Sequence, residues 1–181
     1  MGYMSRMTPI KRVNYFTGQL LGAADFQAEQ DYHRAKQRRH NRALHGSGIA
    51  QGLQVSVGKG DAAGSIVVAP GSALDPAGEL LILCDAGLLP LKSTAVAVLV
   101  CLRYTERPTD PVPVVTASPD AALQPSRIEE GCELVLVDEA SPTADQTRRP
   151  TATASVGVGL ARLVCTRTGW RVDRNFKVAR V

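Results

Sequence analysis

The chain has 181 residues, which suits one domain or one domain with an appended arm. Hydrophobic residues make up 44% of it but aromatic residues only 4%, so the core must consist mainly of valine, leucine, isoleucine and alanine, which disfavours an aromatic-lined ligand cavity. The net charge of +4 is mild, and no apolar run approaches the length of about 18 residues that a membrane-spanning helix needs.

The N-terminal quarter is predicted to contain an arm, a neck and a helix. Residues 1–14 are expected to be flexible or ordered by a partner, and residues 15–48 are expected to form the neck and the helix. The helix is predicted to begin near Ala23 or Ala24 and to end near Leu44 or His45, because acidic side chains occupy its first turns and Gly46 is suited to the left-handed conformation after its last turn.

Residues 49–181 are predicted to form a β-domain, since the hydrophobic period changes to two after the helix. Strands are expected at 49–57, 65–69, 80–84, 88–91, 95–104, 133–137 and in the C-terminal stretch, where Thr168-Gly169 would close a hairpin. The proline-rich residues 105–126 and the residues 139–153 are predicted to be surface loops. One helix followed by seven to nine short strands predicts a mainly β fold: an antiparallel β-sandwich, or a barrel-like domain, preceded by one long N-terminal α-helix.

The cysteines indicate a reducing compartment. They lie far apart, without a Cys-x-x-Cys pair, and each adjoins an apolar run, so we expect buried free thiols and no metal site. Two cross-strand disulfides are the alternative if the protein is exported. The first twelve residues lack the apolar core of a secretory signal, which predicts a cytoplasmic protein. The four residues concerned are Cys84, Cys101, Cys132 and Cys165.

The sequence does not contain a recognisable catalytic, cofactor or metal motif. The histidines His33, His40 and His45 lie on or just after the helix, and none of their spacings matches the four-residue separation of a helical zinc pair. Carboxylates are scattered, and Gly46-Ser47-Gly48 follows a helix, whereas the nucleophile elbow of a hydrolase follows a strand. We therefore predict a protein that is not an enzyme, with a small histidine-dependent hydrolase as a distant rival.

The helix carries a cluster of basic side chains and one ordered polar face. Five lysines and arginines fall within residues 34–42, which raises the alternative of a nucleic-acid-binding module that uses this basic helix. A recognition motif and interleaved aromatic residues are missing, so that alternative is disfavoured. Amide, imidazole and aliphatic side chains recur at helical spacing, which predicts a face that docks onto another subunit. These residues are Gln30, His33, Gln37, His40 or Asn41, and Leu44.

Three motifs of this region resemble a known group of proteins. They are Tyr15-Phe16-x-Gly18-Gln19-Leu20-Leu21, Asp25-Phe26-x-x-Glu29-Gln30-x-Tyr32 and Arg39-His40-Asn41-Arg42-x-Leu44-His45-Gly46-x-Gly48-Ile49. The chain resembles structural proteins of phage tails and contractile injection systems. It is also similar to the N-terminal shoulder domain of the type VI secretion baseplate subunit that links wedges to the membrane complex. Asp25-Phe26-Gln27 stands where that family has a His-Phe-Gln-like element.

The resemblance covers residues 13–57 most strongly and 64–104 more weakly, and it extends to the shoulder domains of phage receptor-binding proteins, which are trimeric. It implies a non-enzymatic structural or adaptor protein of a phage-tail-like contractile particle, whose partners are other baseplate or tail proteins and further copies of itself in a homotrimer. The predicted interface consists of Tyr15, Phe16, Gln19, Leu20, Leu21, Phe26, Gln30, His33, Gln37, Arg38, Arg39, His40, Asn41, Arg42 and His45.

Overall fold

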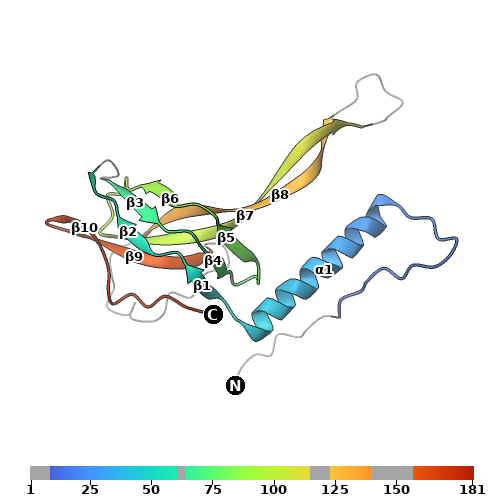
Figure 1. The fold of residues 1–181 in the computed structure, drawn as a ribbon, viewed down its shortest axis with the longest axis horizontal. Coiled ribbons are helices and arrows are strands. Elements are labelled where there is room, and N and C mark those ends of the chain that lie inside the picture. The colour runs from blue at the N-terminus through green and yellow to red at the C-terminus, as the bar shows by residue number, and fades with distance from the viewer. Residues whose placement is uncertain (1–8, 61–63, 115–122, 140–156) are drawn as a thin grey trace.

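A computed structural model describes residues 9–60, 64–114, 123–139 and 157–181 (Figure 1). Over these ranges the chain forms one helix and ten strands, and every pairing between named strands is antiparallel. The predicted mainly β fold with one N-terminal helix is confirmed, and the sheets do not close into a barrel. Residues 1–8 of the predicted arm and residues 140–153 of the second predicted loop lie outside the described ranges.

The helix, α1 (Ala23–Leu44), has the predicted limits. At its start the Asp25 carboxylate accepts a hydrogen bond of 2.9 Å from the backbone N–H of Gly22. At its end the N–H groups of His45 and Gly46 both donate to the carbonyl of Asn41, over 2.9 and 3.1 Å. Gly46 has φ 78, the left-handed conformation that terminates helices, so local sequence signals define both ends.

The strands form three sheets, and neighbouring strands within each sheet are hydrogen-bonded to one another. The first contains β1 (Gly48–Gly52), β4 (Gly71–Leu74) and β5 (Leu80–Leu83). The second contains β2 (Val55–Val57), β3 (Ser65–Val68) and β6 (Gly87–Pro90). The third contains β10 (Gly169–Val172), β9 (Val158–Thr166), β7 (Ala97–Pro113) and β8 (Leu123–Glu139). The single strand predicted at 49–57 is in fact two, because Leu53 adopts φ 58 between β1 and β2.

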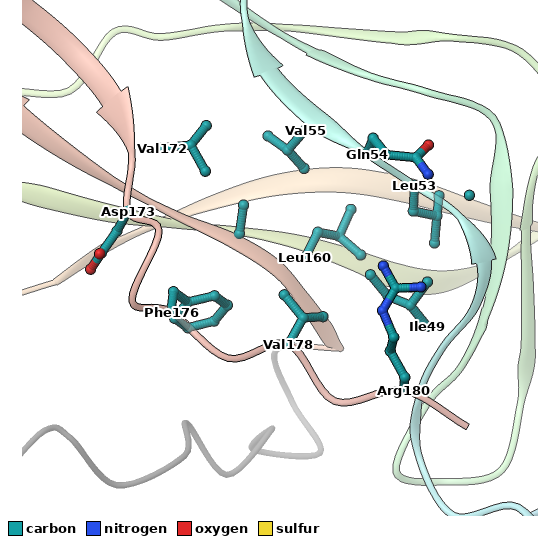
Figure 2. A pocket seen from close by; sticks show the side chains of 12 residues that line it. Ile49, Leu53, Gln54, Val55, Leu160, Val172, Asp173, Phe176, Val178 and Arg180 are labelled. Carbon is teal, nitrogen blue, oxygen red and sulfur yellow. The ribbon is translucent and has the colours of Figure 1, made fainter.

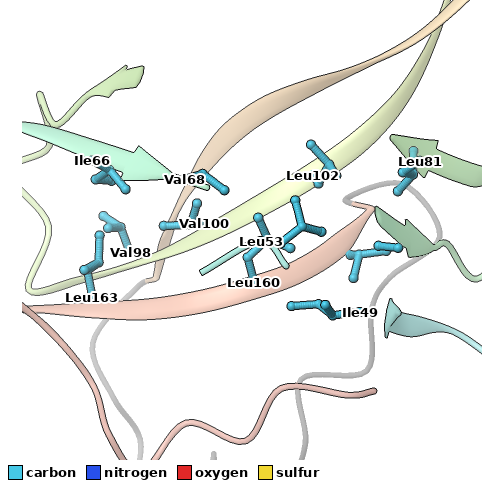
Figure 3. Packing of buried hydrophobic residues seen from close by; sticks show 12 residues of the cluster. Ile49, Leu53, Ile66, Val68, Leu81, Val98, Val100, Leu102, Leu160 and Leu163 are labelled. Carbon is cyan, nitrogen blue, oxygen red and sulfur yellow. The ribbon is translucent and has the colours of Figure 1, made fainter. Parts of the chain in front are cut away.

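The core lies between the third sheet and the two smaller ones (Figure 3). Alternate residues of β7 point into it, namely Val98, Val100 and Leu102, and all three are completely buried. They meet side chains from β1, β3, β4, β5 and β9. Every member of this cluster is aliphatic, as the low aromatic content predicts. The cluster consists of Ile49, Leu53, Ile66, Val68, Ala73, Leu81, Val98, Val100, Leu102, Val158, Leu160 and Leu163.

Residues 105–113 and 123–126 form strands where a loop was predicted, and residues 115–122 of that predicted loop lie outside the described ranges. Strands β7 and β8 stay paired from Ala97–Glu139 to Pro113–Leu123, so they extend past the sheet as a long two-stranded arm (Figure 1). We call this the hairpin arm, residues 103–113 and 123–133. The prolines misled the prediction because they usually interrupt sheets. Strand β7 pairs with β9 only as far as Leu102, so beyond that point its second edge is free, and free edges tolerate proline.

The C-terminal residues return to the start of the β-domain. The N–H of Ile49 donates to the carbonyl of Ala179 over 2.8 Å, and the N–H of Val181 donates to the carbonyl of Ile49 over 3.2 Å. A short parallel bridge between Ile49 and Arg180 results. Gly48, where the helix enters the β-domain, therefore lies close to the C-terminal residues Ala179 and Arg180 (Figure 1).

Candidate interaction surface

The C-terminal half of α1 is held against the β-domain by polar contacts. Asn41 is the buried residue of the helix, with 7% of its surface exposed. Its Nδ2 donates a 2.8 Å hydrogen bond to the carbonyl of Gly78, in the turn between β4 and β5. A buried amide is costly unless it is hydrogen-bonded, so this contact fixes both the position and the rotation of the helix.

Two carboxylates of the β-domain bind arginines that lie one and two helical turns before Asn41. Glu79 pairs with Arg38, and Glu106 at the base of the hairpin arm pairs with Arg34, whose guanidinium also lies 3.9 Å from Glu79. The hydroxyl of Tyr104 donates to Glu106 over 3.0 Å. The hydrogen bond that Arg38 donates to Glu79 raises the pKa of Arg38, and burial together with the bond to Glu106 raises the pKa of Tyr104. We call Arg34, Arg38, Asn41, Gly78, Glu79 and Glu106 the polar clasp.

Gly78 lets the helix backbone come this close. It adopts φ 92, and a Cβ built on it would lie 2.4 Å from the carbonyl oxygen of Arg38 and 2.9 Å from its Cα. Both neighbours are backbone atoms, so neither can rotate away. The turn that follows β4 therefore requires glycine for conformation and for space.

We predict that Glu79→Gln weakens the clasp. Glutamine keeps the shape but removes the charge that binds both Arg34 and Arg38, and charge-assisted hydrogen bonds contribute roughly 1.5–3 kcal/mol, less where water screens them. We expect faster amide hydrogen exchange over residues 34–44, with an effect that shrinks as salt is raised. Glu129→Gln is the control, because Glu129 pairs with Arg107 on the hairpin arm, and equal exchange in the two variants would contradict the prediction.

The neck and the start of α1 leave large apolar side chains in solvent. Leu20 is 93% exposed, Phe16 66%, Phe26 57% and Tyr15 51%, while Leu21 is 38% exposed. A turn organises the neck, because the N–H of Gln19 donates to the carbonyl of Phe16 over 3.1 Å and the Gln19 side chain accepts from the N–H of Phe16 over 3.4 Å. Contiguous exposed apolar residues of this kind mark interaction sites.

The outer face of α1 presents the amides and imidazoles of the predicted docking face. His33 bonds to Glu29 over 3.0 Å, Gln37 donates to the side chain of Asn41 over 3.0 Å, and the rings of His40 and His45 lie 5.6 Å apart, edge to face. The predicted residues between Gln30 and His45 that remain largely in solvent are Gln30, His33, Gln37, His40, Arg42, Leu44 and His45.

The structure divides the predicted interface residues into two groups. Arg38 and Asn41 contact their own β-domain, and Arg39 is half-buried. The remaining predicted residues lie on the neck or on the outer face of the helix, and their contact with another subunit stays a prediction. Gly78, Glu79 and Glu106 were not predicted, because only the fold brings them to the helix. The one available signal was that the basic run 34–42 contains no carboxylate of its own.

A small pocket of about 210 Å³ opens between β1, β9 and the C-terminal segment (Figure 2). Its walls are mostly aliphatic, including Leu53, Leu160 and Val178, with the ring of Phe176 at one end and the guanidinium of Arg180 at the other. Across the described ranges, no group of histidine, cysteine, aspartate and glutamate side chains is arranged to hold a metal ion. A search of the same residues for a helix able to cross a membrane finds none.

Comparisons with known proteins find similar solved structures but no match to a family model or a curated protein. Among solved structures it is similar to a crystal structure of TssK, with a TM-score of 0.51 and 17% identity over 91% of this chain. It is also similar to a chain of the type VI secretion system TssK-TssF-TssG baseplate subcomplex, with a TM-score of 0.52 and 15% identity over 94% of this chain. A chain of the baseplate complex from the type VI secretion system gives a TM-score of 0.55 and 14% identity over 96%.

The chain spans 41%, 62% and 42% of the lengths of these three chains, so it corresponds to part of each. At this level of identity the likeness concerns the fold. The resemblance to a type VI baseplate subunit that the neck and helix motifs predict is thereby confirmed for the fold, over nearly the whole chain.

Proposed function

We propose that this chain is a non-enzymatic structural or adaptor subunit of a phage-tail-like contractile particle, located at its baseplate or tail. The observation that carries the proposal is the neck, where Phe16 and Leu20 stand in solvent beside a helix already fixed by the polar clasp. The fold shared with baseplate chains supports the same reading. Assembly would occur in the cytoplasm, on a particle that is later released or docked at a membrane.

The proposed assembly uses three parts of the chain. Residues 1–14 are an arm, residues 15–48 are the neck and helix that contact neighbouring subunits, and residues 49–181 are the β-sandwich domain. The partners are other baseplate or tail proteins and two further copies of the chain in a homotrimer. Burying one large apolar side chain contributes about 1.5–3 kcal/mol, so the exposed residues of the neck suffice to hold such a joint.

We predict that the double variant Phe16→Ala, Leu20→Ala abolishes this assembly and leaves the β-domain folded. Both side chains lie far from the core, so their loss removes interface area without opening a cavity. Light scattering across protein concentrations measures the mass, and circular dichroism checks the fold. A matched control is Ile82→Ala, Leu88→Ala, which removes two exposed apolar side chains from the β-domain.

Each result of this experiment bears on the proposal. A trimeric wild type and control with a monomeric double variant support it. An unchanged oligomeric mass in the double variant overturns the assigned interface, and a wild type that stays monomeric at every concentration overturns the homotrimer. The nucleic-acid alternative is weakened because Arg34 and Arg38 are paired with carboxylates of their own chain.

A further inference from the structure

Cys132, at the base of the hairpin arm, lies against β5, the strand that Cys84 directly follows. Cys84 directly follows β5, and Cys132 lies on β8 where the arm joins the sheet. The thiol of Cys132 donates to the carbonyl of Ile82 over 3.3 Å, so its Sγ rests against the last residues of β5. Strands β5 and β8 are in contact at this point.

Residues shortly before and shortly after Cys84 in the sequence both contact β8. Ile82, two residues before it, accepts the hydrogen bond from Cys132. Gly87, three residues after it, lies so near β8 that a Cβ added there would be 2.3 Å from Cδ1 of Leu134. Cys84 is therefore held between two contacts with neighbouring positions of the same strand. The electrostatic effect of Cys84 on the pKa of Cys132, which is raised mainly by burial, is consistent with this proximity.

The two sulfurs also differ in their access to solvent. Cys84 is exposed and Cys132 is half-buried, which suits one thiol to meet an oxidant and the other to resolve the product. The remaining cysteines are placed differently. Cys101 is buried in the sheet, where burial raises its pKa to about 11, and Cys165 lies on β9 opposite Trp170 of the β9–β10 hairpin.

We propose that Cys84 and Cys132 form a redox-sensitive pair that a peroxide converts into an intramolecular disulfide. The Cys84 thiolate attacks the peroxide, the O–O bond breaks, and Cys84 becomes a sulfenic acid while one water is released. The Cys132 thiolate then attacks the Cys84 sulfur and expels the hydroxyl as a second water. Two thiols and one hydrogen peroxide thus give one disulfide and two waters, with the peroxide reduced and the sulfurs oxidised.

The disulfide would join the end of β5 covalently to the base of the hairpin arm. In the reduced protein these elements are joined by a thiol hydrogen bond and side-chain packing. Oxidation closes a loop that contains β6, all of β7 and the part of β8 that precedes Cys132. A particle that passes from a reducing to an oxidising compartment would then change the attachment of its arm without any change in partner.

The test uses the full chain, reduced and then exposed to hydrogen peroxide, with peptide mapping by mass spectrometry under non-reducing conditions. We expect a Cys84–Cys132 crosslink as the main intramolecular product. Cys132→Ser should instead leave Cys84 as a sulfenic acid that dimedone traps. The resolving step uses the Cys132 thiolate, and because the pKa of Cys132 is raised, its rate should increase by about tenfold per pH unit from pH 7 to 8.

Cys165→Ser is the matched control, since it removes an exposed thiol that the structure places elsewhere, and it should form the crosslink at the wild-type rate. Peptide mapping of the wild-type protein tests for the Cys84–Cys132 crosslink even if a serine variant folds poorly. A crosslink that involves Cys165, a purely intermolecular disulfide, or free thiols at both Cys84 and Cys132 after Cys165 has been oxidised would each overturn the proposal.

Discussion

Leu81→Ala should lower the free energy of unfolding by about 2–5 kcal/mol, the range observed when a buried leucine is truncated in a packed core. Leu81 on β5 is completely buried and belongs to the cluster that joins the first sheet to β7 and β9. Truncation removes apolar contacts on both sides of the sandwich and leaves a cavity, since its neighbours are fixed in paired strands. Equilibrium unfolding in urea measures the change through the shift of its midpoint.

The adjacent residue provides the matched control. Leu80 lies on the same strand with its side chain 53% exposed, so Leu80→Ala makes the same chemical change on the opposite face. We expect a loss of roughly 0.5–1 kcal/mol there. Equal destabilisation by the two variants would mean that the two faces of β5 are buried alike, and would contradict the sandwich core described above.

Gly78→Ala should release α1 from the β-domain. The new Cβ would lie 2.4 Å from the carbonyl oxygen of Arg38, so either the turn or the helix must move, and the hydrogen bond between Asn41 and Gly78 is lost with it. We expect a loss of roughly 2 kcal/mol of docking free energy, equivalent to about a thirtyfold faster amide exchange over residues 34–44. Hydrogen exchange followed by mass spectrometry resolves this segment.

A second glycine provides a control that distinguishes the effect of the close contact from the effect of backbone strain. Gly169 also has a positive φ, of 112, but no atom lies within 4 Å of a Cβ built there. Gly169→Ala therefore has a similar conformational cost, roughly 1–2 kcal/mol, without touching the helix. Exchange over residues 34–44 should stay at the wild-type rate in this variant. If both variants loosened the helix equally, the loss would reflect global destabilisation and the clasp would have no special role.

Local signals predicted the helix and most strands, because the residues that define them are close in sequence. The limits of α1 depend on Asp25 and Gly46, which act within one turn. Strand β4 was missed because Gly71 and Ser72 are typical turn residues, and it forms a strand only because β1 and β5 flank it on both sides. In the same way, the hairpin arm contains prolines that argue against a strand unless one edge is known to be free.

The polar clasp could not be predicted from the sequence. Arg38 and Glu79 are 41 residues apart and Arg34 and Glu106 are 72 apart, so their pairing depends on the register of β4, β5 and β7. The basic run predicted that the arginines of the helix contact another subunit. It could not show that two of them bind carboxylates of the β-domain in the same chain. The neck, by contrast, entered the predicted interface through the motif Tyr15-Phe16-x-Gly18-Gln19-Leu20-Leu21, whose residues are adjacent in sequence and carry the family resemblance.

The continuity of β7 has a mechanical consequence. One strand runs from Ala97 in the core to Pro113 in the hairpin arm, and its cross-strand ion pairs Arg103–Glu133 and Arg107–Glu129 stiffen the arm where both faces meet solvent. A sideways load on the arm is thus carried along covalent backbone into Val98 and Val100, the middle of the sandwich. The hairpin arm is also attached to α1 through the ion pair between Glu106 and Arg34. Displacement of the arm therefore strains its contact with the helix, and displacement of the helix strains the arm.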